Sequence, residues 1–338
     1  MANMMDYLDW RGDLTFQQAP FNEVDNLLLT ELVYVDFTGI VPGEESGEAV
    51  FLKDASRMFW EQHTQGEVLE RVSMTKMSAF VMDKMAHTRR FENVCLSSYV
   101  QDIDKEQQSQ FCAVSITLDD NSLFVSYSGT DSTIVGWREN FNMAYLQHTP
   151  GQEKAVRYLN HAVRQGHQAV RVGGHSKGGN LAVYAGIFCE GDIRKRIVKI
   201  YSNDGPGFEE GVLQSSSYRE LLPRIKRVLP QKAIVGMLLG HRADYEVVHS
   251  TENHAKQHDM LSWEVLGAQM VYEDKLSEQS VAIDGIIKTW VAAMDMSQRR
   301  HFVETVFSML EHAGVNNVDD FYHLKWKNVS EIIRSQRE

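Results

Sequence analysis

The segment 174–178, which has the sequence GHSKG, restricts the fold of this chain more than any other segment. It follows an apolar, strand-like run at 169–173 and precedes a helix-like run at 180–185. The pattern G-x-S-x-G between a strand and a helix is typical of a nucleophile elbow, a tight turn that exposes a serine at the edge of a sheet. The sequence therefore predicts a strand–turn–helix unit here and makes Ser176 the candidate catalytic nucleophile.

A serine hydroxyl is a poor nucleophile, so Ser176 needs a base, an acid that orients the base, and N–H donors for the oxyanion. One donor is expected to be the backbone N–H of Lys177, the residue after the nucleophile. The other must come from an earlier loop, and Thr130 lies in the segment 127–131 (YSGTD) at the end of a predicted strand. A simple strand-ending turn is the alternative interpretation of that segment.

The Lys177 side chain places a positive charge at the N-terminus of the predicted helix, where the helix dipole is also positive. This arrangement is locally unfavourable. We therefore expect the ammonium group either to reach solvent or to pair with a carboxylate, and the sequence leaves both possibilities open.

The base is expected among the histidines after Ser176, because the chain order serine, acid, histidine is typical of catalytic triads in serine hydrolases built around such an elbow. The candidates are His241, His249, His254, His258, His301, His312 and His323. We choose His258, which follows the predicted last strand at 245–249 by a short loop and lies near Trp263. A surface-loop histidine is the alternative interpretation of His258, and the three histidines beyond residue 300 lie in helical sequence.

Two aspartates compete for the role of the acid. Asp244 follows the apolar run 233–239, which the pattern predicts to be the preceding strand, and it is the first choice. Asp204 is the alternative, because the segment 203–208 (NDGPGF) is a turn sequence directly after the predicted strand 197–201. Ligands usually bind at that carboxyl edge of a parallel sheet, although Asp before Gly is also a common turn residue.

Composition narrows the classes of partner. The formal net charge of -12 argues against a nucleic-acid partner and against electrostatic docking on anionic membranes. The three cysteines are not closely spaced, and no HExxH or other ligand spacing occurs, so we expect no disulfide framework, no metal and no cofactor. The chain has no basic and apolar leader and no apolar run of membrane-spanning length, from which we expect no transmembrane segment and a cytoplasmic location.

Strand-like and helix-like runs alternate through the middle of the chain, which predicts a largely parallel sheet covered by helices on both faces. A hairpin is expected at 111–127. We expect a single domain in which 1–90 form an N-terminal helical segment or cap, 91–265 form the core, and 266–338 form a C-terminal helical extension.

Taken together, these residues resemble a bacterial branch of the α/β-hydrolase superfamily, known as a domain of unknown function and related to the class 3, fungal-type lipases. The resemblance implies an α/β-hydrolase fold with a mostly parallel central sheet and helical additions at both ends. It rests on the segments 7–13 (YLDWRGD), 21–25 (FNEVD), 174–182 (GHSKGGNLA), 203–208 (NDGPGF), 235–238 (VGML) and 257–259 (QHD).

The similarity to the class 3 lipases extends to the segment 127–131 with Trp137 and Asn140, which corresponds to the lipase oxyanion loop. Ser128 replaces the arginine of that loop, and Lys177 replaces the usual leucine after the elbow serine. The lipase acid, an aspartate followed by Val-Pro, has no counterpart here. The acid is therefore the residue that the resemblance defines least.

The expected function is a serine hydrolase that cleaves carboxylic esters, small or lipid-like, through an acyl-enzyme on Ser176, with His258 as base and Asp244 as acid. An acyltransferase with the same triad and a non-catalytic binding protein with a hydrolase fold are the alternatives. The sequence leaves the ester and the oligomeric state open.

Overall fold

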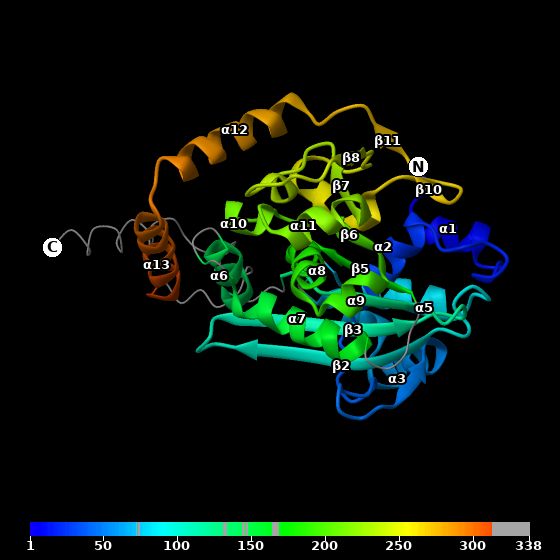
Figure 1. Cartoon of the computed structure of the whole chain (residues 1–338). Helices are drawn as coiled ribbons and strands as arrows, with labels where there is room; N and C mark the ends of the chain where they lie inside the picture. Colours follow the sequence, from blue (N-terminus) through cyan, green and yellow to red (C-terminus); the bar gives the residue numbers. More distant parts are fainter. Residues whose placement is uncertain are drawn as a thin grey trace.

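The structure is a computed structural model that describes residues 1–71, 73, 75–130, 134–143, 146, 148–163 and 169–312. Within these residues, nine strands form one sheet in the order β1-β2-β3-β4-β5-β6-β7-β8-β11, and β9 and β10 form a separate hairpin (Figure 1). The strands are β1 (Ala49–Phe51), β2 (Cys95–Asp104), β3 (Ser109–Thr117), β4 (Leu123–Tyr127), β5 (Val170–His175), β6 (Ile197–Asn203), β7 (Ile225–Pro230), β8 (Tyr245–Val248), β9 (Val265–Leu266), β10 (Gln269–Met270) and β11 (Tyr272–Glu273).

The five strands β4 to β8 are parallel, whereas β1 to β3 and β11 join the sheet by antiparallel pairing. The hairpin predicted at 111–127 is confirmed as β3 and β4. Because β4 to β8 point the same way, their carboxyl ends meet at one edge of the sheet. The mostly parallel central sheet covered by helices is that of the α/β-hydrolase fold, as predicted.

Helices cover both faces of the sheet because the central strands are apolar on both sides. In β4, Phe124 packs into the core cluster on one face, while Leu123, Val125 and Tyr127 pack into the cluster on the other. The helices are α1 (Met4–Arg11), α2 (Glu23–Leu32), α3 (Leu52–Gln62), α4 (Gln65–Glu70), α5 (Ser78–Ala86), α6 (Ile134–Asn142), α7 (Pro150–Val163), α8 (Lys177–Phe188), α9 (Gly191–Arg196), α10 (Glu210–Leu213), α11 (Ser216–Leu221), α12 (Glu278–Ala292) and α13 (Met296–His312).

The helices α1 to α5 lie in the N-terminal segment, and α2 is part of the core. All residues of α2 from 24 to 32 are buried, and the helix packs on β4 and β5. Its first turn is closed by Asn22, whose side chain accepts hydrogen bonds from the backbone N–H groups of Val24 and Asp25. The helices α7 and α8 cover the opposite face.

The strand predicted at 233–239 is wrong. The strand before β8 is β7, and the apolar run forms a turn with a short 3-10 helix at Val235–Met237. The misleading feature is Arg227, a buried arginine within β7 whose guanidinium donates to the carbonyls of Ala243 (2.9 Å) and Gly236 (3.0 Å). These two hydrogen bonds make a buried guanidinium compatible with a central strand, but a charged residue interrupts the apolar pattern by which such a strand is recognised in a sequence.

The C-terminal extension predicted from residue 266 starts with strands, because β11 pairs with β8 and completes the sheet, and only then continues into α12 and α13. Among the described helices, none combines the length and the apolar character that crossing a bilayer requires. The continuation of the extension beyond residue 312 lies outside the described residues.

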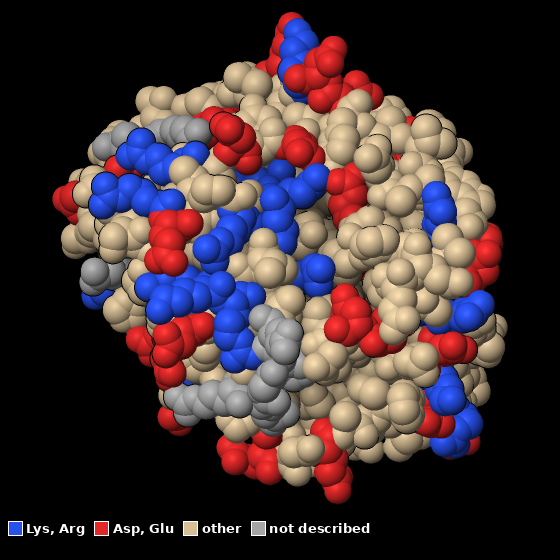
Figure 2. All heavy atoms as spheres, turned by 45° about the vertical axis from the view of Figure 1, so that its right-hand side comes forward, with Lys and Arg blue, Asp and Glu red and all other residues tan. Residues whose placement is uncertain are grey.

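Charge is unevenly distributed over the surface. The sequence carries 46 acidic and 34 basic residues, yet Lys and Arg side chains gather on one part of the face shown in Figure 2. The net charge therefore does not describe this face. The expectation that the protein avoids nucleic acids and anionic membranes stays a prediction.

Candidate active site

The predicted strand–turn–helix unit is confirmed, with Ser176 between β5 and α8. Ser176 has a φ of 57° and a ψ of -129°, a left-handed conformation that is unfavourable for a residue with a side chain. The glycines are required by close backbone contacts: a Cβ at Gly174 would collide with the Gly178 carbonyl, and one at Gly178 with the Tyr127 carbonyl. Neither position tolerates a side chain, which explains the pattern G-x-S-x-G.

His258 lies at the end of a 3-10 helix and its Nδ1 is 2.6 Å from Oδ2 of Asp204. Asp204 follows β6 directly and is 1% exposed. Its other oxygen, Oδ1, accepts the backbone N–H of Gly236 at 3.0 Å. The backbone N–H of Ser176 donates to the Asn203 carbonyl at 2.9 Å, which brings the elbow next to the aspartate. The elbow, an acid and a histidine therefore meet at the carboxyl edge of the sheet.

The structure brings the alternative aspartate, Asp204, to His258 in place of Asp244. Asp244 is exposed and immediately precedes β8, so it lies at the amino end of a strand that is parallel to β5. That is the opposite edge of the sheet from Asp204. The expectation for Asp244 depended on the strand at 233–239, and it fails because the strand in that place is β7.

The Lys177 side chain is fully buried and pairs with a carboxylate, one of the two outcomes expected. Its Nζ lies 2.9 Å from Oε2 of Glu139 in α6, and both side chains have 0% exposure. The same Nζ donates to the side chain (2.6 Å) and the backbone carbonyl (2.5 Å) of Gln110 in β3. The ammonium group is thus directed away from the elbow into the protein, and only the backbone N–H of Lys177 is a candidate oxyanion donor.

The loop that contains Thr130 lies directly against the elbow. A Cβ on Gly129 would be 2.8 Å from the His175 carbonyl oxygen and 3.1 Å from Cβ of Ser176. The hydroxyl of Thr130 accepts a hydrogen bond from Nδ2 of Asn140 in α6 at 2.5 Å. Residues 131–133 and the side chain of Trp137 lie outside what the structure describes.

Two residues of the site, Tyr34 and His175, are not among the residues predicted from the sequence. The Tyr34 hydroxyl is 2.9 Å from Nδ1 of His175, and Nε2 of His175 is 2.7 Å from the carbonyl oxygen of His258. Burial, together with repulsion from His258, holds the pKa of His175 well below its usual range, so its ring is neutral. The signal for His175 in the sequence is its position inside the elbow, but the chain order serine, acid, histidine points only to histidines after Ser176.

The other candidate histidines are placed elsewhere. His249 directly follows β8, and its Nδ1 lies 2.7 Å from Oε1 of Glu273. His301 and His312 belong to α13, as the helical pattern predicted, and His323 lies outside the described residues.

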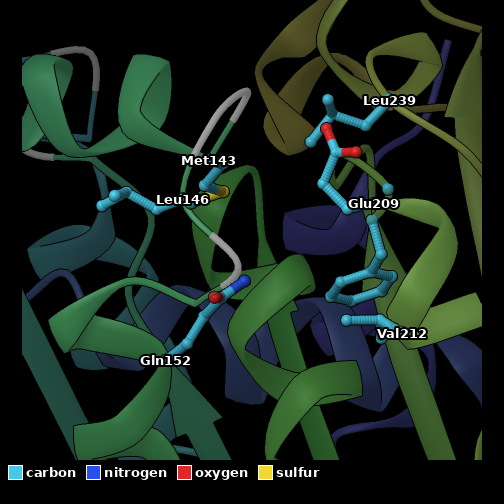
Figure 3. A pocket seen from close by; sticks show the side chains of 8 residues that line it. Met143, Leu146, Gln152, Glu209, Val212 and Leu239 are labelled. Carbon is cyan, nitrogen blue, oxygen red and sulfur yellow. The ribbon is translucent and has the colours of Figure 1, made fainter. Parts of the chain in front are cut away.

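A small pocket lies beside the elbow helix (Figure 3). Two of its lining residues contact Asn180, one turn beyond Ser176 in α8: Asn180 accepts a hydrogen bond from Nε2 of Gln152 (2.8 Å) and donates one to the Gly207 carbonyl (2.7 Å). The lining combines apolar side chains with one carboxylate and one amide, and consists of Met143, Leu146, Gln152, Gly207, Phe208, Glu209, Val212 and Leu239.

Comparison with known proteins identifies the family to which the chain belongs. No curated protein matches the chain. Among solved structures, M37 lipase is similar at 13% identity and a TM-score of 0.35, over 63% of this chain and 68% of the lipase. A propeptide complex of a Rhizomucor miehei lipase deletion mutant is similar at 14% identity and a TM-score of 0.37, over 70% of this chain and 80% of the other. A family model described as Mbeg1-like matches residues 85–308, more than half of the chain, and the protein therefore belongs to the Mbeg1-like family.

Proposed function

We propose that the protein is a serine hydrolase that cleaves carboxylic esters through an acyl-enzyme on Ser176. The observation that carries this proposal is the contact of 2.6 Å between His258 and the buried carboxylate of Asp204, beside a strained elbow serine. A histidine oriented by a buried aspartate is the arrangement that activates serine in hydrolases of unrelated folds. Membership in the Mbeg1-like family and the α/β-hydrolase fold agree with it.

The reaction follows from the contacts of each group. Because Nδ1 of His258 is engaged by Asp204, Nε2 is the nitrogen left to take the proton of Ser176 as its Oγ attacks the ester carbonyl. The backbone N–H of Lys177 and Thr130 stabilise the negative oxygen of the tetrahedral intermediate. The ester C–O bond then breaks, His258 returns the proton to the departing alcohol, and water activated by His258 releases the acid and restores Ser176.

The pocket beside α8 is small and its lining presents both polar and apolar groups, so it does not identify the acyl group of the substrate. Turnover of p-nitrophenyl esters of increasing acyl length measures which acyl group the enzyme accepts.

The direct test is labelling with a fluorophosphonate probe, which reacts covalently with an activated serine. We expect the native wild-type protein to be labelled and Ser176→Ala to be unlabelled. A matched control is Ser126→Ala, which removes another buried hydroxyl, in β4, and should keep wild-type labelling. Wild-type protein that is not labelled would contradict the proposal in favour of a non-catalytic binding protein.

Analysis of the products formed by the wild-type protein distinguishes hydrolysis from acyl transfer. Turnover with an added alcohol should release mainly free acid if water is the acceptor. A new ester as the main product at modest alcohol concentration would instead assign the acyl-enzyme to an acyltransferase.

A further inference from the structure

A chain of hydrogen bonds through Tyr34 and His175 joins the two loops that flank Ser176. The backbone N–H of Gly129 lies 3.1 Å from the Tyr34 hydroxyl, which lies 2.9 Å from Nδ1 of His175. The other ring nitrogen, Nε2, lies 2.7 Å from the carbonyl oxygen of His258. The chain starts next to Thr130 and ends at the backbone of the histidine that contacts Asp204.

The direction of every hydrogen bond in this chain is determined by chemistry. A carbonyl oxygen only accepts, so Nε2 of His175 carries the hydrogen and Nδ1 is the acceptor in the neutral ring. The Tyr34 hydroxyl must then donate to Nδ1, while its oxygen accepts from the Gly129 N–H. Burial raises the pKa of Tyr34 and lowers that of His175, so both groups stay in the protonation states that this order needs.

We propose that His175 and Tyr34 are positioning residues that hold the His258 backbone and the oxyanion loop in register with Ser176. This inference rests on the proposed hydrolase function. His175 has a second contact with the same target, since its ring lies 4.4 Å from the His258 ring between centroids. The donors and the base must be held within about 0.5 Å for efficient catalysis, and a displacement of about 1 Å can cost a factor of about 100 in rate.

The position of Tyr34 in the chain makes the link long-range. Tyr34 follows α2, which packs on the sheet, and it precedes His175 by 141 residues. The hydroxyl thus ties the N-terminal segment to a loop after β4 and to the elbow after β5. The loop after β4 and the elbow follow neighbouring strands but have separate backbones. A side chain that hydrogen-bonds to both can therefore set the distance between them.

The experiment compares Tyr34→Phe, His175→Phe and the double variant with the wild type. Each substitution keeps an aromatic ring and removes the polar atoms of the chain. We expect kcat for a p-nitrophenyl ester to fall about 10- to 100-fold in each single variant, with KM changed less than about twofold. The double variant should lose little more than the worse single variant, because both substitutions interrupt the same chain.

A matched control is Tyr7→Phe, which removes another buried tyrosine hydroxyl, one that is 2.9 Å from Oδ1 of Asp25 and belongs to the N-terminal segment. It should lower the melting temperature and keep kcat. His175→Gln is a second substitution at the elbow position. Its amide N–H can still donate toward the His258 carbonyl, and its kcat should lie between those of the wild type and His175→Phe.

Two results would overturn the inference while leaving the proposed function intact. One is an active wild-type protein in which Tyr34→Phe and His175→Phe keep kcat and lose only stability, as Tyr7→Phe does. The other is a double variant whose losses multiply as independent effects. A wild-type protein that neither turns over esters nor reacts with the fluorophosphonate probe would instead overturn the proposed function, and the positioning role with it.

Discussion

At the scale of single residues, two residues of the candidate site have a left-handed backbone conformation. Ser176 has a φ of 57° and Asp204 a φ of 48°, and each directly follows a strand, β5 and β6 respectively. Such a backbone costs about 1–3 kcal/mol at a residue with a side chain, and it is concentrated at functional sites. For Asp204, the turn allows the carboxylate to accept hydrogen bonds from both the Gly236 N–H and the His258 ring.

The kinetics of two variants can distinguish Asp204 from Asp244 as the acid that orients His258. Asp204→Asn should lower kcat for an ester by about 10⁴, because the amide no longer orients His258 in the tautomer that accepts the serine proton. Asp244→Asn should change kcat less than about twofold, since Asp244 is exposed at the opposite edge of the sheet. Steady-state kinetics on both purified variants measures the difference. Equal effects would contradict the assignment of Asp204.

At the scale of helices, α2 and α5 meet through a buried acid. The Ser78 hydroxyl donates to Oε2 of Glu31 at 2.6 Å, and Glu31 is 3% exposed. Burial, with a contribution from the charge of Asp259, raises the pKa of Glu31 to about 8. Glu31 is therefore protonated in the folded protein at neutral pH, although it ionises in the unfolded chain near pH 4.5.

This acid makes stability depend on pH in a predictable direction. Between pH 4.5 and 8, the folded state holds a proton on Glu31 that the unfolded state has lost, so the contribution of Glu31 to stability falls as pH rises. Glu31→Gln keeps the acceptor for Ser78 and has no proton to lose. We expect the free energy of unfolding of the variant to gain on the wild type by about 1 kcal/mol per pH unit in this window.

Urea unfolding at pH 5, 6, 7 and 8 measures this trend. The two proteins should be closest in stability at pH 5, which serves as the internal control. A constant difference between the wild type and the variant over this range would mean that Glu31 is ionised in the folded protein.

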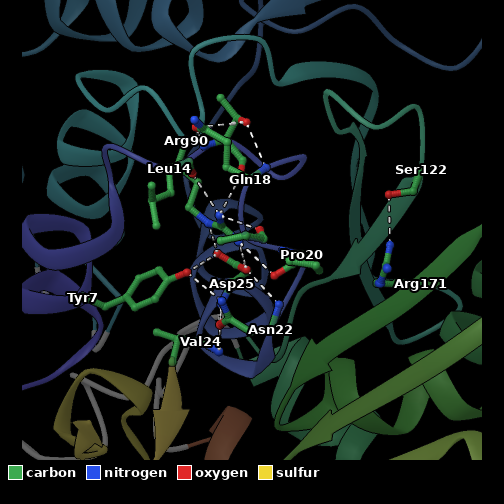
Figure 4. Close-up of polar contacts among 12 residues, drawn as sticks. Tyr7, Leu14, Gln18, Pro20, Asn22, Val24, Asp25, Arg90, Ser122 and Arg171 are labelled. Atoms are coloured by element: carbon green, nitrogen blue, oxygen red, sulfur yellow. Dashed lines mark hydrogen bonds and ion pairs between the residues drawn. The ribbon is translucent and has the colours of Figure 1, made fainter. Parts of the chain in front are cut away.

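At the scale of the whole molecule, a buried ion pair fastens the N-terminal segment together (Figure 4). Arg90 contacts both carboxylate oxygens of Asp25, at 2.6 and 2.7 Å, and both side chains are fully buried. Tyr7 donates to the same carboxylate at 2.9 Å, and the backbone N–H of Asn22 does so at the same distance. The segments 7–13 and 21–25, which carry much of the family resemblance, thus supply Tyr7, Asn22 and Asp25 to this anchor, and Arg90 comes from outside them.

Removal of one partner should destabilise the whole fold. Arg90→Met leaves the carboxylate of Asp25 buried without its cation, and we expect a loss of about 3–5 kcal/mol in the free energy of unfolding. The control is Lys84→Met, which removes an ion pair with the exposed Asp9 and should cost less than about 1 kcal/mol. Urea denaturation of both variants tests this. Equal losses in the free energy of unfolding would show that the buried pair stabilises the fold no more than the exposed pair does.

The same anchor explains why the N-terminal segment could be predicted to be helical while its place in the fold could not. Its helices follow from local periodicity and from caps such as Asn22. Whether they form a cap or cover a sheet depends on contacts such as that of Asp25 with Arg90, 65 residues away. Those contacts leave no periodic signal in either segment.

The elbow at Ser176, the hairpin of β3 and β4, and the prediction of His258 as the base follow from the local sequence, because they depend on residues that are contiguous or follow a strand closely. The contact of Asp204 with His258, the pairing of Lys177 with Glu139, and the side chains that join the loops around Ser176 are visible only once the chain is folded. Each of these depends on which run becomes β7 and on which edge of the sheet a side chain reaches. Hydrogen bonding and burial between distant segments determine those outcomes, and local pattern does not record them.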